Sequence, residues 1–190
     1  RMSICPWQLD DASHGVQVRP LQETDAEALT TAVIAAVPTV GRWMDWCRPG
    51  YTRDTALTWI RYCQTQWTAP WGEREFGIFD RVDGALLGCA GINQINTLNS
   101  FGNLGYWIRP EAVGRGLASR VADWVARFGF EQMGLVRLEL VIRVDNAISR
   151  RVAEKLGARF EAVMRSRLMF EGGAYDAAMY GLLPADLSGR

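Results

Sequence analysis

The sequence predicts one α/β (α+β) domain, in which a single sheet carries helices on both faces. Extended apolar runs occur both before and after helical patterns, and this mixed order is typical of a sheet covered by helices. The 190 residues, of which 48% are hydrophobic, are sufficient for one domain with its own core. Because no repeat or linker divides the chain, we predict one domain over residues 1–190, with about 1–14 as a leader that need not be ordered.

The first third of the chain predicts a strand followed by a helix. "VQVR", residues 16–19, has the alternation of a short strand, and residues 20–36 carry a helical pattern that Pro38 ends. Thr24 could cap this helix, because Glu27 stands three residues further on, as in a capping box.

The middle of the chain predicts a loop, a second helix and a hairpin. Glycines and prolines punctuate residues 39–54, which indicates a loop or a broken helix. Residues 54–67 are typical of a helix, because one stripe carries Leu57, Ile60, Cys63 and Trp67. Residues 75–92 form two extended runs around Asp83-Gly84, which is a strong hairpin signal.

A strand and an amphipathic helix follow. "LGYWI", residues 104–108, predicts a strand, and "RPEAVGRGLAS", residues 109–119, leads from it into a helix. The expected buried face of this helix carries Leu117, Val121, Trp124, Val125 and Phe128. The charged residues Arg120, Asp123, Arg127 and Glu131 fall elsewhere and predict a solvated side.

The last third predicts a strand, a helix and a hairpin. "VRLELVIRV", residues 136–144, is typical of a buried strand. Asn146 is a good N-cap for a helix over residues 147–156, and Gly157 suits its C-terminal end. Residues 160–183 then match a hairpin around "EGG".

The charge and hydropathy of the chain exclude several classes of partner. Lys and Arg number 21, as do Asp and Glu, so the chain lacks the basic excess that neutralises nucleic-acid phosphates. No apolar run approaches membrane-spanning length, and we find no signal-peptide pattern. We therefore expect a cytoplasmic protein without a nucleic-acid or membrane partner, while a homo-oligomer stays open.

The histidine and cysteine content argues against a metal site. His14 is the only histidine, and Cys5, Cys47, Cys63 and Cys89 form no Cys-x-x-Cys pair, whereas zinc sites need several such ligands at short spacings. We expect no metal, and four reduced thiols that pack as small apolar side chains. A single histidine in the leader also disfavours a Ser-His-Asp triad.

Gly114 and Gly116 stand where a strand passes into a helix, an arrangement that can bind phosphate. The first N–H groups of a helix have no partner within it, and the helix dipole favours an anion there. The two glycines either admit a pyrophosphate to the backbone or merely shape a loop. A nucleotide-phosphate-binding protein is a weaker alternative, because the third glycine of a dinucleotide fingerprint and the Gly-Lys-Ser/Thr of a P-loop are missing.

Three segments together resemble the GNAT acyltransferase superfamily, and most closely its RimJ/RimL-type N-acetyltransferase branch. They are "LGYWIRPEAVGRGLA", "VDNAISRRVAEKLGA" and "YDAAMYGLLPADL", within a likeness that runs from about residue 16 to 187. The resemblance implies the GNAT fold, a mixed and bent β-sheet flanked by helices on both faces. It also implies transfer of an acetyl group from acetyl-CoA, as co-substrate, to a primary amine of a protein N-terminus or a small amino compound.

The resemblance also implies a co-substrate site. In the family, the strand equivalent to residues 104–108 splays from its neighbour and pairs with the pantetheine arm, which implies contacts from Trp107 and Ile108. The family's glycine loop matches residues 113–118, and Asn146 and Ser149 match its Asn-x-x-Ser pair across the groove. The loop residues that would hold the pyrophosphate, by backbone N–H groups, are Val113, Gly114, Arg115, Gly116, Leu117 and Ala118. Val113 stands where the family usually has Gln or Arg.

Ser149 matches the family's proton donor. A hydroxyl at a helix start can protonate the departing sulfur, and Tyr106 or Tyr180 are the substitutes for this role. A backbone N–H of the splayed strand can polarise the thioester carbonyl. No covalent enzyme intermediate is required, so the absence of a nucleophile–histidine pair is compatible with this chemistry.

The group that would deprotonate the acceptor amine is open at this stage. Relatives often carry Glu two residues before the Gly-Tyr of the splayed strand, where this chain has Asn103, which cannot accept a proton at neutral pH. Glu75, Asp45 and Glu139 are candidates, each with an ordinary structural role as its alternative, and a water relay is equally tenable.

In the family, the loop between the first two helices and the C-terminal hairpin wall the acceptor pocket. Here that loop is "PTVGRWMDWCRPGYTRD", in which Trp43, Trp46 and Tyr51 either wall the pocket or pack on the core. Its arginines, Arg42, Arg48 and Arg53, outnumber Asp45 and Asp54. We therefore expect a neutral or anionic acceptor with one free amine rather than an aminoglycoside. The alternative function is a non-catalytic acyl-CoA-binding regulator, which the retention of Ser149 disfavours.

Overall fold

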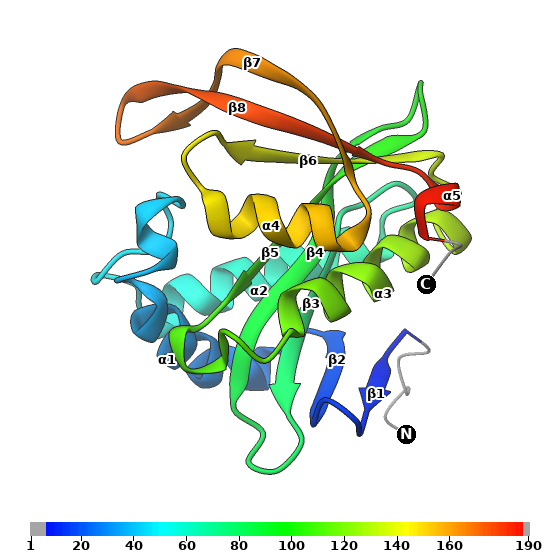
Figure 1. Ribbon diagram of the computed structural model, residues 1–190. Helices are drawn as coiled ribbons and strands as arrows, with labels where there is room; N and C mark the ends of the chain where they lie inside the picture. The colour runs from blue at the N-terminus through cyan, green and yellow to red at the C-terminus, as the bar shows by residue number, and fades with distance from the viewer. Residues whose placement is uncertain (1–6, 188–190) are drawn as a thin grey trace.

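Eight strands form one sheet in the order β1-β2-β3-β4-β5-β6-β8-β7 (Figure 1). The structure is a computed structural model that describes residues 7–187. Every neighbouring pair of strands is antiparallel except β5 and β6, which are parallel. The strands are β1 (Leu9–Asp11), β2 (Val16–Pro20), β3 (Arg74–Asp80), β4 (Leu86–Asn96), β5 (Phe101–Ile108), β6 (Arg137–Arg143), β7 (Arg159–Phe170) and β8 (Gly173–Leu182).

Helices cover both faces of this sheet, which confirms the predicted fold class. In Figure 1, α3 and α4 lie in front of the sheet, while α1 and α2 lie behind it. Two separate clusters of buried apolar side chains fill the spaces between the sheet and these helix pairs. The helices are α1 (Ala26–Ala36), α2 (Arg53–Thr68), α3 (Leu117–Glu131), α4 (Ala147–Leu156) and the short α5 (Pro184–Leu187). Among the described residues, no helix combines the length and the apolar character needed to cross a membrane.

The second half of the leader is part of the sheet. Leu9–Asp11 pair with Val16–Val18, and the Asp11 carboxylate accepts a hydrogen bond from Nε of Arg120 on α3 at 2.8 Å. Sequence reasoning missed β1 because three residues are too few to display an alternating pattern. Residues 1–6, and with them Cys5, lie outside the described part of the chain.

The start of α1 differs from the prediction. A 3₁₀ turn over Glu23–Asp25 precedes the helix, and the backbone N–H of Gln22 donates to Oδ2 of Asp25 at 2.8 Å. Both Asp25 oxygens also accept from the Arg19 guanidinium, at 2.8 and 2.9 Å. The predicted capping box of Thr24 and Glu27 is therefore wrong, because the box forms between Gln22 and Asp25, whose carboxylate is also held by an arginine from β2.

The other predicted elements are confirmed within a few residues at each end. The predicted second helix is α2, and Thr52 caps it by accepting from the backbone N–H of Thr55 at 3.2 Å. The Asp83-Gly84 turn joins β3 to β4. The expected face of α3 is buried, with Val121 and Val125 both at 0% exposure. These elements depend on local periodicity and capping, which a sequence displays directly.

Candidate active site

The sheet opens at its centre, because β5 and β6 diverge. These two parallel strands pair only over Phe101–Asn103 and Arg137–Glu139. By contrast, β4 stays paired with β5 as far as Ile108, and β8 stays paired with β6 as far as Arg143. The β5 backbone beyond Asn103 is therefore without a strand partner on its β6 side, as the family resemblance implies for the strand at 104–108.

The alternation of the β4–β5 ladder decides which backbone groups face this gap. The N–H of Arg109 donates to the carbonyl oxygen of Leu87 at 2.8 Å, on the β4 side. Residues two apart on a strand point the same way, so the backbone of Trp107 also turns toward β4. The N–H and C=O groups of Tyr106 and Ile108 consequently face the gap and are available to an extended ligand that carries amide groups.

The glycine loop presents unpartnered N–H groups to open space. Gly114 and Gly116 have φ angles of 86° and 74°, a region that favours glycine, and Gly116 is the N-cap of α3. A side chain at either position would meet no atom within 4 Å. The first helical hydrogen bond runs from the N–H of Arg120 to the Gly116 oxygen. Within the described residues, the N–H groups of 114–119 make no hydrogen bond, so this loop suits a pyrophosphate.

The side chains of the loop contribute less than its backbone. Val113 is exposed and Leu117 is buried in the core between α3 and the sheet. Ala118 is half-buried in the first turn of α3. The guanidinium of Arg115 lies 3.8 Å from an Asp80 oxygen, at the far end of β3. Arg115 is thus the one residue of 113–118 whose side chain brings a charge to this loop.

Tyr106 and Ser149 meet across the gap. The Tyr106 hydroxyl donates to the backbone oxygen of Ser149 at 3.0 Å and lies 3.3 Å from its Oγ. Asn146 caps α4 by accepting from the Ser149 N–H at 3.2 Å. Burial raises the pKa of Tyr106 to about 12, so its phenol stays protonated at neutral pH. The two hydroxyls therefore form one protonated pair at the start of α4.

The hydroxyl of Tyr180, the other substitute predicted for the proton donor, already has two side-chain partners. Its ring is fully buried. Its hydroxyl donates to Oε1 of Glu154 and accepts from Nε of Arg150, both at 3.0 Å. Because both partners lie on α4, Tyr180 connects that helix to β8.

The candidate bases have different surroundings. Asp45 accepts from Arg48 at 2.8 Å and from the backbone N–H of Glu171. Glu139 accepts from Nε of Arg137 at 3.0 Å. Glu75 is partly buried, and its carboxyl group makes no hydrogen bond or ion pair among the described residues. Burial, followed by the charge of Glu73, raises the pKa of Glu75 to about 8.

The loop between α1 and α2 contacts the tip of the β7–β8 hairpin. The Arg48 guanidinium lies 2.8 Å from Asp45 and 3.1 Å from Glu171. Sequence reasoning counted the loop charges without Glu171, which lies 126 residues from Asp45. With Glu171 included, Arg48 pairs with two carboxylates, so this contact keeps one net negative charge.

Arg143 completes this contact and was missed by sequence reasoning. Its guanidinium lies 4.0 Å from the ring centroid of Tyr175 on the hairpin and 5.0 Å from that of Trp43 in the loop. Trp46 packs edge-on against Trp107 of β5, with centroids 5.6 Å apart. The loop tryptophans therefore pack against neighbouring elements. The sequence holds no signal for Arg143, because its partners come from two distant segments.

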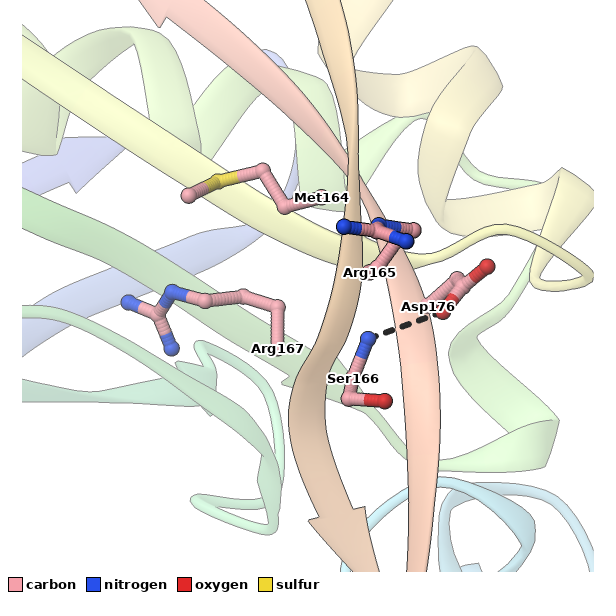
Figure 2. A pocket seen from close by; sticks show the side chains of 5 residues that line it. All are labelled: Met164, Arg165, Ser166, Arg167 and Asp176. Carbon is pink, nitrogen blue, oxygen red and sulfur yellow. Dashed lines mark hydrogen bonds between the residues drawn. The ribbon is translucent and has the colours of Figure 1, made fainter.

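A hollow of about 640 Å³ lies beside a bulge in β7 (Figure 2). The bulge falls between Met164 and Leu168, and the backbone N–H of Ser166 donates to Oδ1 of Asp176 at 2.8 Å. Figure 2 shows Met164 and Arg167 extending to one side of the hairpin and Asp176 to the other. In the described part of the chain, Arg165 and Arg167 make no ion pair, so the hollow carries unpaired positive charge.

The cysteines and acidic side chains are the residue types that could ligate a metal ion. Cys47, Cys63 and Cys89 are buried and free. Over residues 7–187, no group of three or more His, Cys, Asp or Glu side chains is arranged so that it could hold a metal ion.

Comparison with known proteins gives a consistent result. The family model described as an acetyltransferase (GNAT) domain matches residues 16–159. The putative ribosomal N-acetyltransferase YdaF of Bacillus subtilis is 27% identical over 175 residues, which cover 92% of this chain and 94% of YdaF. The spermidine N(1)-acetyltransferase of Escherichia coli is 25% identical over 163 residues, or 85% of this chain and 82% of the relative.

A solved structure agrees with the observed topology. The putative ribosomal-protein-serine acetyltransferase from Vibrio cholerae superposes with a TM-score of 0.80 at 26% identity, covering 94% of this chain and 98% of the other.

Proposed function

The chain belongs to the GNAT acetyltransferase family, and from that premise we propose how it binds its two substrates and moves the protons between them. It is an N-acetyltransferase that depends on acetyl-CoA and acts on amines. The observation that carries the proposal is the gap between β5 and β6, which has an unpartnered N–H loop at one side and the Tyr106–Ser149 pair across it.

The residues around the gap fit the co-substrate. The N–H groups of residues 114–118 in the loop would hold the pyrophosphate, because they are unpartnered and open to approach. The backbone groups of Tyr106 and Ile108 would pair with the pantetheine amides. Asn146 keeps the start of α4 in place on the opposite side. When bound, acetyl-CoA supplies an activated acetyl thioester.

Two groups of the chain would act on that thioester. A gap-facing N–H of β5, from Tyr106 or Ile108, would donate to the carbonyl oxygen and stabilise the charge that develops there. Ser149, hydrogen-bonded with Tyr106, would give a proton to the departing sulfur. No metal is needed in this scheme, since backbone and hydroxyl groups provide each polar contact.

For the acceptor, we propose an uncharged or acidic compound with one primary amine, such as a peptide N-terminus or an amino acid derivative. At the loop–hairpin contact the two carboxylates, Asp45 and Glu171, share the one guanidinium of Arg48, which leaves a single negative charge there. Further along the same hairpin, the hollow is lined by two arginines, Arg165 and Arg167, and one carboxylate, Asp176. A polyamine, which carries several positive charges, would need several uncompensated carboxylates instead. The names of YdaF and the Vibrio cholerae protein point to ribosomal proteins, whereas the Escherichia coli relative acts on spermidine.

We further propose a cytoplasmic location, on the basis of the free thiols Cys47, Cys63 and Cys89. A non-catalytic acyl-CoA-binding regulator is not favoured, because the named relatives of this chain are acetyltransferases.

An acceptor screen with acetyl-CoA, read by thiol release, tests the acceptor class. We expect peptides with acidic residues after a free N-terminus to exceed spermidine and aminoglycosides in kcat/KM by about tenfold or more, because a charge-assisted hydrogen bond is worth roughly 1.5–3 kcal/mol. A polyamine or aminoglycoside that is turned over faster than every peptide and amino acid derivative would overturn the proposal.

A charge reversal sharpens this test. Arg167→Glu is expected to lower kcat/KM for acidic peptides and to raise it for spermidine, with acetyl-CoA binding unchanged. Arg81→Glu is the matched control, because Arg81 lies in the β3–β4 turn and its side chain pairs, among residues 7–187, only with Asp10 at the surface. Equal effects of the two reversals would show that the hollow has no part in acceptor choice.

A further inference from the structure

The acceptor amine needs a proton acceptor that the usual position of the family does not supply. Asn103 stands at that position, and its Nδ2 donates to Oδ1 of Asn93 at 2.9 Å. The amide cannot take a proton at neutral pH. If the chain acetylates amines as proposed above, the proton must pass to a different group or to water.

The register of the sheet brings one carboxyl group to the face that carries Asn103. Glu75 of β3 pairs with Gly91 of β4, and Gly91 pairs with Gly105 of β5. Trp107 lies two residues from Gly105 and packs against the core under α1 and α2, so the row of Glu75, Gly91 and Gly105 faces that side too. Asn103 also lies on this face, one row away.

The two glycines leave room for this carboxyl group. A side chain at Gly91 would collide with Oε2 of Glu75, so the Glu75 side chain lies over Gly91. A side chain at Gly105 would meet only Nδ2 of Asn103, at 3.9 Å. Since neighbouring strands are about 4.8 Å apart, the carboxyl group lies about one strand spacing from the open space above Gly105.

We propose that Glu75 is the general base of the acetyl transfer and that the acceptor amine binds above Gly105. The proposal rests on the function proposed above. The acceptor ammonium gives one proton to the Glu75 carboxylate, which passes it to solvent, and the nitrogen then forms the new C–N bond with the acetyl carbon. The nitrogen loses its second proton through Glu75 to solvent as the C–S bond breaks. The sulfur takes its proton from the Ser149–Tyr106 pair, which solvent reprotonates. A carboxylate within reach directly or through one water suits this step.

The surroundings of Glu75 suit a base that works near neutral pH. The titratable groups near it are Glu73 just before β3, Cys63 on α2 and Cys89 on β4, while Asn103, Gly105 and Trp107 on β5 do not titrate. Burial and the Glu73 charge raise its pKa to about 8. Its ionised form, and with it kcat, should therefore be lost as the pH falls below that value.

Glu75→Gln is the first test. We expect kcat at saturating acceptor to fall roughly a hundredfold, with acetyl-CoA affinity unchanged, and the decline of kcat toward acidic pH to disappear. Formate should partly rescue Glu75→Ala, which a purely structural role would not allow. Wild-type turnover measures the proposed function separately. An active wild type with a Glu75→Gln variant of equal kcat would overturn the role of Glu75 alone.

Two further variants test the proposal without changing Glu75 itself. Glu73→Gln, the matched control, should keep kcat at high pH and move its acidic decline to lower pH, because a like charge is removed. Gly105→Ala fits the backbone without strain and should raise the KM for the acceptor while acetyl-CoA binding persists. An unchanged acceptor KM in Gly105→Ala would refute the placement of the amine.

The stability of Glu75→Gln provides a separate check. A pKa raised above the unfolded value means that the folded wild type holds its proton more tightly, so its stability should fall as the pH rises from about 4.5 toward 8. Glu75→Gln should lack this decline and melt no lower than the wild type at pH 8. A lower melting temperature there would contradict an unpartnered, buried carboxyl group.

Discussion

Gly116→Val is expected to remove measurable acetyl-CoA binding while the circular dichroism spectrum stays native. Gly116 adopts a φ of 74° at the N-cap of α3, and a β-branched residue is a genuine outlier there. A non-glycine residue in this region costs roughly 1–2 kcal/mol, and relief of that strain would turn the N–H groups of the loop away from the pyrophosphate. Isothermal titration calorimetry with CoA and acetyl-CoA measures the loss.

Gly134→Val is the matched control for this variant. Gly134 has a φ of 68°, and a side chain there would also meet nothing within 4 Å, but it lies in the turn between α3 and β6. The two substitutions therefore introduce the same kind of backbone strain at different places. Wild-type affinity in Gly116→Val, or equal losses in both variants, would mean that the loop does not bind the pyrophosphate.

Ser149→Ala is expected to lower kcat by about a hundredfold or more, as removal of a general acid typically does, with little change in acetyl-CoA affinity. Tyr106→Phe should cost about fivefold, because it removes the hydrogen bond to the Ser149 carbonyl, worth about 1 kcal/mol. The double variant should lose little more than Ser149→Ala, since residues that act as a unit are not additive.

Steady-state kinetics, with calorimetry for acetyl-CoA, separates these roles. Tyr180→Phe serves as the control, because its hydroxyl is committed to Glu154 and Arg150 and should leave kcat within about twofold. Full activity in Ser149→Ala together with a large loss in Tyr106→Phe would move the acid to the tyrosine. Full activity in both would assign protonation of the sulfur to solvent.

The acceptor side of the molecule contains charge contacts that the sequence of the loop alone does not predict. From the loop alone, arginines outnumber acidic residues, and that count favoured a neutral or anionic acceptor. The hairpin brings Glu171 to Arg48 and Asp45, so that the acidic residues equal the three arginines of the loop, while Arg165 and Arg167 on the same hairpin stay unpaired. The expected acceptor is still a neutral or anionic one, but the arginines expected to attract it are those of the hairpin rather than those of the loop.

The capping of α1 and the short β1 are the clearest failures at the level of secondary structure. Thr24 and Glu27 satisfy a local rule, yet the capping box forms between Gln22 and Asp25, whose carboxylate Arg19 on β2 also holds. Sequence spacing records potential hydrogen bonds, whereas a salt bridge from another element decides which of them forms.

The sequence by itself determined the order and type of the main elements, the face that α3 buries, the caps of α4 and the two glycines before α3. Each depends on residues within one or two turns of one another, so periodicity and local backbone preference display it. Only the tertiary structure decided that β5 and β6 diverge, that Tyr106 reaches Ser149 across 43 residues, and that Glu75 lies over Gly91 toward Gly105. These placements depend on strand register and on which faces pack together, and both result from burying a whole core, which no local pattern encodes.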